Sequence, residues 1–177
     1  MAAAQAIGTQ IEAIKANPDR AHAYAALLHL QRRSADDASS MDSIAISSPT
    51  LIALLLTDIH DPDEEIAAQA LKCLGFMIYH PSLVPTFSDG DAPLVLESLA
   101  KLIMTTDMKA ICNLGVWCIS IQQFGADALG ACLELLLGAV VHALDNPFGS
   151  QSTSFEAMQV LVSIVQDDRI LSGGAYC

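Results

Sequence analysis

The sequence predicts an all-α fold, a HEAT/armadillo-like α-solenoid of about three helical-hairpin repeats, and three observations support this. Hydrophobic residues make up 53% of the 177 residues and the mean hydropathy is +0.43, while only 16% of the residues are charged. Apolar residues recur at the three-and-four spacing of buried helical stripes. No stretch shows the sustained alternation of a strand. Stacked helices bury most of their surface, which would explain this composition.

Eight segments carry the apolar spacing of helices, and capping or turn residues bound most of them. The second segment follows Asp19 as its cap, and the third is expected to bend near Pro49. In the fourth, Asp61 is expected to cap the helix, and Pro62 suits the first helical position. Helices are predicted over 3–16, 20–33, 43–60, 61–80, 92–104, 107–123, 125–144 and 154–166, with loops at 34–40, 81–90 and 148–153.

A small residue recurs inside the apolar stripe of three of these helices. Gly115 lies 45 residues after Ala70, and Ala157 lies 42 residues after Gly115. These offsets fall within the roughly 40–47-residue period of HEAT and armadillo repeats, and a small side chain lets two helices approach closely. Each repeat would pair a first helix with a second one: 43–60 with 61–80, 92–104 with 107–123, and 125–144 with 154–166.

The chain is expected to form one repeat domain over residues 1–177, ending as a truncated array. Residues 167–177 are expected to be a frayed tail, because Gly173 and Gly174 do not favour a capping helix. An array that stops there would expose apolar surface after Gln166. We therefore expect the isolated chain to self-associate, or to be poorly soluble, through this end.

Composition argues against several classes of partner. Eight Lys and Arg residues stand against 20 Asp and Glu, and a net charge of −12 disfavours general binding to a nucleic-acid backbone. The longest apolar stretch, 129–144, is too short and too polar for a clean membrane span. The five cysteines show no CxxC spacing, and the Ala-rich N-terminus lacks the pattern of a secretory signal. An intracellular, reducing compartment is expected, and no cofactor.

An acidic cluster with a histidine follows the third predicted helix: Asp58, His60, Asp61 and Asp63. One interpretation is a divalent metal site or a metal-dependent hydrolase. The other is a helix-to-helix turn that carries capping carboxylates. A hydrolase needs further ligands at set spacings, and the other histidines do not supply them. The turn is therefore the favoured interpretation.

Other reactive side chains also indicate structure rather than catalysis. Cys112 and Cys118 are expected to be buried thiols, because no activating base or cationic neighbour is visible in the sequence. His22 and His29 are seven residues apart, whereas two zinc ligands on one helix need a spacing of four. A solvent-facing stripe is favoured for these histidines. The sequence therefore predicts a protein that is not an enzyme.

The repeat offsets align Trp117, the single tryptophan, with two polar residues that would face solvent. Lys72 lies 45 residues before Trp117, and Gln159 lies 42 residues after it. This column could line the concave surface of the array, with Trp117 as an exposed anchor for a partner. The favoured alternative is a tryptophan packed on the neighbouring repeat, since large aromatic side chains bury most of their area. Three more residues could join the same face: Lys109, Asn113 and Gln123.

Three runs of sequence carry more information than their periodicity. They are DPDEEIAAQALKCLGFMIYHP at 61–81, KAICNLGVWCISIQQ at 109–123 and FEAMQVLVSIV at 155–165. In this order they resemble the N-terminal HEAT-repeat domain of the telomere-associated Rap-interacting factor family, in a form similar to plant members. The middle run, with its Trp-x-Ile-Ser core, is the most specific of the three.

The resemblance implies a nuclear, chromatin-bound scaffold that acts in telomere maintenance, the control of replication timing and the response to double-strand breaks. It also implies a long HEAT array that brings protein phosphatase type one to chromatin. This chain is far shorter than family members and has no Arg-Val-x-Phe or Ser-Ile-Leu-Lys docking motif. Phosphatase recruitment would therefore use regions absent here. The alternative function is that of a generic cytosolic armadillo-like adaptor.

Overall fold

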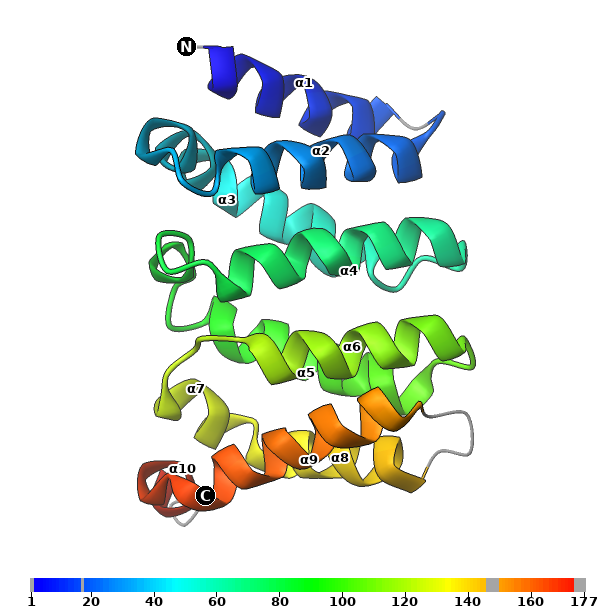
Figure 1. Ribbon diagram of the computed structural model, residues 1–177, viewed down its shortest axis with the longest axis vertical. Helices are drawn as coiled ribbons and strands as arrows, with labels where there is room; N and C mark the ends of the chain where they lie inside the picture. Colours follow the sequence, from blue (N-terminus) through cyan, green and yellow to red (C-terminus); the bar gives the residue numbers. More distant parts are fainter. Residues whose placement is uncertain (1, 17, 146–149, 174–177) are drawn as a thin grey trace. The chain divides into compact units, whose positions relative to one another are not determined.

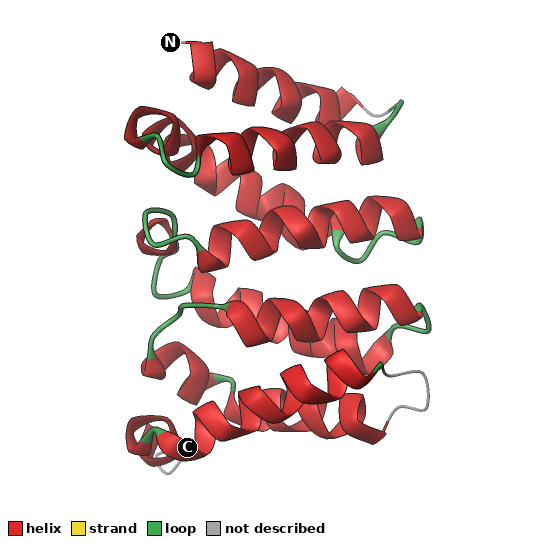
Figure 2. Ribbon diagram, viewed as in Figure 1, coloured by secondary structure: helices red, strands yellow, loops and turns green. Residues whose placement is uncertain are grey.

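The computed structural model describes residues 2–16, 18–145 and 150–173, and these residues form helices and loops with no strand (Figure 2). The all-α fold class is thereby confirmed. The helices are α1 (Ala2–Ala16), α2 (Arg20–Ser34), α3 (Ala38–Asp58), α4 (Glu64–Tyr79), α5 (Asp91–Thr105), α6 (Lys109–Ile121), α7 (Ala126–Ala131), α8 (Leu133–Asp145), α9 (Gln151–Gln166) and α10 (Asp168–Gly173), with a 3-10 turn, η1, at Val84–Thr86.

The chain forms two compact units, residues 1–87 and 88–177. In the first unit, α1 packs against α2 and α3, and α4 packs against α2 and α3. Figure 1 shows α3 behind α2 and α4. The first helices of the two hairpins, α1 and α3, therefore contact each other. The second helices, α2 and α4, do the same, as in stacked helical hairpins.

The second unit repeats this layering. The hairpin of α5 and α6 packs on the hairpin of α8 and α9, with α5 against α8 and α6 against α9 (Figure 1). The solenoid-like repeat fold predicted from the offsets is confirmed, and the three predicted hairpins are present. Helices α1 and α2 form a further hairpin of the same kind, which the offsets did not include.

The recurring small residues lie where the repeat argument places them. Ala70, Gly115 and Ala157 are all buried in second helices. A Cβ atom added at Gly115 would lie 2.9 Å from Cγ1 of Ile103 on α5, closer than real Cβ contacts. Glycine therefore permits the close approach of α5 and α6 in this hairpin.

Three helices, α3, α4 and α9, begin three or more residues from the predicted start, and α9 begins at Gln151, inside the predicted loop 148–153. Helix α4 begins at Glu64, and its cap is Asp63, whose Oδ1 accepts hydrogen bonds from the amides of Glu65 at 2.9 Å and Ile66 at 3.3 Å. Asp61 was the wrong choice of cap. Helix α3 begins inside the predicted loop, because Asp37 accepts from the amide of Ser40 at 3.0 Å and caps it.

The predicted long helix over 125–144 is two helices, α7 and α8, separated at Cys132. Cys132 leaves the helical region, with φ −113° and ψ 12°, and its buried thiol donates to the carbonyl of Pro93 on α5 at 3.3 Å. Both halves are apolar, so the spacing alone did not reveal the break.

The prediction of a frayed tail over 167–177 is wrong for residues 168–173, which form α10, in which Ile170 is buried. Residues 174–177 lie outside the described residues.

By length and composition alone, α3 could cross a membrane, a property that core helices of soluble proteins share. Part of its apolar surface is buried in the first unit, at Met41, Ile44, Leu51, Ile52 and Leu55, whereas Ile46 is 83% exposed. The helix also carries the buried polar residues Ser48 and Asp58. Pro49 lies inside α3, which continues on both sides of it.

Candidate partner surfaces

The acidic cluster forms an ion-pair network that joins α2 to the turn between α3 and α4. Arg20 places Nη1 2.7 Å from Oδ1 of Asp58 and Nη2 2.6 Å from Oδ2 of Asp61. The hydroxyl of Tyr24 donates to Oδ2 of Asp58 at 2.7 Å. Burial, and then this hydrogen bond to a carboxylate, raise the pKa of Tyr24 above its usual range. These carboxylates bind protein donors, which confirms the interpretation of the cluster as a structural turn.

No group of three or more His, Cys, Asp or Glu side chains in the described parts of the chain could hold a metal ion. The thiols of Cys112 and Cys118 are buried, and burial raises the pKa of Cys118 above its usual range. A nucleophilic cysteine needs a lowered pKa. The prediction that both thiols are buried is confirmed. His22 and His29 are both exposed on α2, in line with the predicted solvent-facing stripe.

The predicted partner residues are divided between the two units. Lys72 is partly exposed on α4 in the first unit, and the other five residues belong to the second unit. Lys109 begins α6 and is exposed, as is Gln123 just after that helix. Trp117 is partly buried, so its exposure is intermediate between that of an exposed anchor and that of a packed tryptophan. The column as a binding face stays a prediction.

Asn113 has a structural contact within the second unit. Its Oδ1 accepts a hydrogen bond at 2.8 Å from Oγ1 of Thr153, a buried residue in the first turn of α9. Thr153 in turn interacts with Ser150, the N-cap of α9. Asn113 therefore ties α6 to the start of α9, whatever else it contacts.

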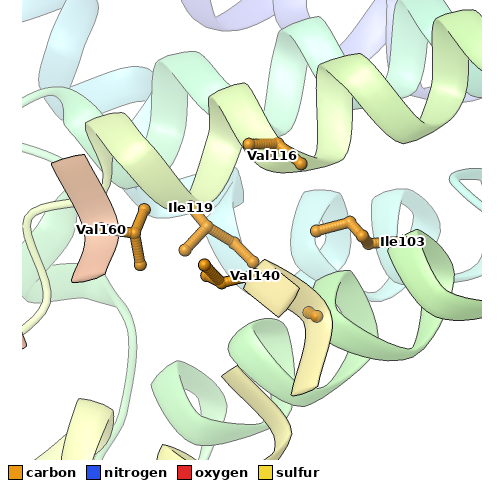
Figure 3. Close-up of a pocket in the computed structure, with 6 residues that line it drawn as sticks. Ile103, Val116, Ile119, Val140 and Val160 are labelled. Carbon is orange, nitrogen blue, oxygen red and sulfur yellow. The ribbon is translucent and has the colours of Figure 1, made fainter. Parts of the chain in front are cut away.

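The side chains of α6 that face the next hairpin are covered. Val116 and Ile119 lie with Ile103, Val140 and Val160 around an apolar cavity of about 10 Å³ (Figure 3). Val116 and Ile119 are each 3% exposed. Helices α8 and α9 thus complete the apolar packing of α6, as expected for consecutive repeats.

An apolar stripe on α9 has no such cover from the residues that the structure describes, and the sequence did not single it out. Phe155 is 65% exposed, Met158 48%, Val162 47% and Val165 64%. Gln159, the predicted partner residue on this helix, lies with three of these residues and Ser163 around a groove of about 320 Å³. Exposed apolar side chains of this size, gathered on one helix, are typical of an interaction surface. We call the four apolar residues the α9 seam.

Comparison with known proteins gives a consistent result. The family model described as Rap1-interacting factor 1 N terminal matches residues 13–171. Telomere-associated protein RIF1 of Homo sapiens is 28% identical over 130 residues, which is 71% of this chain and 5% of that protein. The protein of the same name from Mus musculus is 25% identical over 124 residues, 70% of this chain and 5% of that protein. The chain thus spans about one-twentieth of the length of these relatives. On the match over residues 13–171, the chain belongs to the Rap1-interacting factor 1 N-terminal family.

Proposed function

We propose that this chain is a non-enzymatic, protein-binding segment of a telomere-associated chromatin scaffold. Membership of the Rap1-interacting factor 1 N-terminal family carries the proposal, together with two relatives whose names describe telomere-associated proteins. The stacked helical hairpins support it, because such arrays bind partners through many moderate contacts along an extended surface. Its place of action would be the nucleus, on chromosomes.

The partner face would be the column on the second helices, with Trp117 as its aromatic anchor and Lys109 as an exposed cation nearby in sequence. Partly buried tryptophans are favourable anchors, because the packed part fixes the ring and the exposed part is available to a partner. Asn113 and Gln159 would add polar contacts that supply specificity rather than affinity.

In the relatives, this segment is a small part of a much longer protein. The wider roles would belong to such a longer protein. These are the control of replication timing, the response to double-strand breaks, and the recruitment of protein phosphatase type one through other regions. With a net charge of −12, this segment would reach chromatin through bound proteins rather than by gripping DNA.

The test is chromatin fractionation and pull-down of the full-length product. Recovery of telomeric chromatin supports the proposal, whereas a cytosolic protein that co-purifies with transport or trafficking factors favours the adaptor alternative. Trp117→Ala is expected to lower the recovery of protein partners at least about tenfold, as for an aromatic hot spot. Lys101→Ala, a change at an exposed residue of α5, is the matched control and should leave recovery unchanged.

A further inference from the structure

We draw no further inference here: the strongest candidate, the apolar surface of Leu94 on α5 and Val141 on α8, which are 52% and 60% exposed on two helices that pack against each other, carries nothing because nothing in the structure shows what covers it.

Discussion

Removing the carboxylate of Asp58 tests how the first unit is held together. Asp58 is 5% exposed and accepts from both Arg20 and Tyr24, each at 2.7 Å. Asp58→Ala leaves the buried Tyr24 hydroxyl without its acceptor and Arg20 with Asp61 alone. Removing one partner of a buried ion pair costs about 3–5 kcal/mol. Because Arg20 keeps Asp61 at 2.6 Å and its side chain is 22% exposed, we expect the lower end, about 3 kcal/mol.

Urea unfolding followed by circular dichroism measures this loss as a change in the free energy of unfolding. Asp61→Ala is the matched control, and it should lower that free energy by only about 1 kcal/mol, because Arg20 keeps its bond to the more buried Asp58. Tyr24→Phe removes one hydrogen bond to a charged group and should lower it by about 1.5–2 kcal/mol.

The double variant Tyr24→Phe/Asp58→Ala separates a shared interaction from two independent ones. Since the two side chains bond each other, their effects should overlap by at least about 1 kcal/mol. Strictly additive losses would refute the reasoning, as would an Asp58→Ala variant that is no less stable than Asp61→Ala. Either result would mean that apolar packing alone fixes this turn.

The remaining predictions concern pH and packing. Burial raises the pKa of the Cys73 thiol from 9.0 to about 12, so above pH 9 the unfolded chain loses this proton while the folded chain keeps it. The free energy of unfolding should therefore fall as pH rises from about 9 toward 12, and Cys73→Ala should flatten this fall; a stability that holds constant over that interval contradicts it. Gly115→Ala should lower the free energy of unfolding by about 1 kcal/mol, because the new methyl group meets Ile103. Gly8→Ala, where no atom lies within 4 Å of the added Cβ, should raise it by about 0.5–1 kcal/mol, and equal effects at both glycines would argue against close packing at Gly115.

The sequence predicts the helices well because their apolar spacing is local information. The cap of α4 could not be chosen from it, since Asp61 and Asp63 are both suitable residue types. The choice depends on Arg20, 41 residues earlier, which binds Asp61 in the folded chain. The break at Cys132 likewise depends on a contact with Pro93 that no local pattern records.

The partner surfaces show a different limit. The spacing of the α9 seam is visible in the sequence, but an apolar stripe of this kind usually marks a core face. Whether Met158 is covered depends on what stacks on α9, and its counterpart Val116 is covered by the next hairpin. The role of Asn113 was also hidden, because its hydrogen bond joins residues 40 positions apart. Sequence offsets locate equivalent positions, and only the three-dimensional packing distinguishes exposed members from buried ones.

The network around Arg20 has a consequence for how the first unit unfolds. In repeat proteins, stability is a sum of terms within each repeat and terms between neighbours, and the second kind determines cooperativity. Here the stabilising free energy between the first two hairpins comes from apolar packing and also from a charged contact. In that contact, Arg20 of α2 binds the turn before α4. Neither hairpin can open without leaving buried polar groups unpaired in the other. Amide protons of α2 and α4 should therefore exchange with solvent in a single cooperative event, so that the two hairpins behave as one unfolding unit.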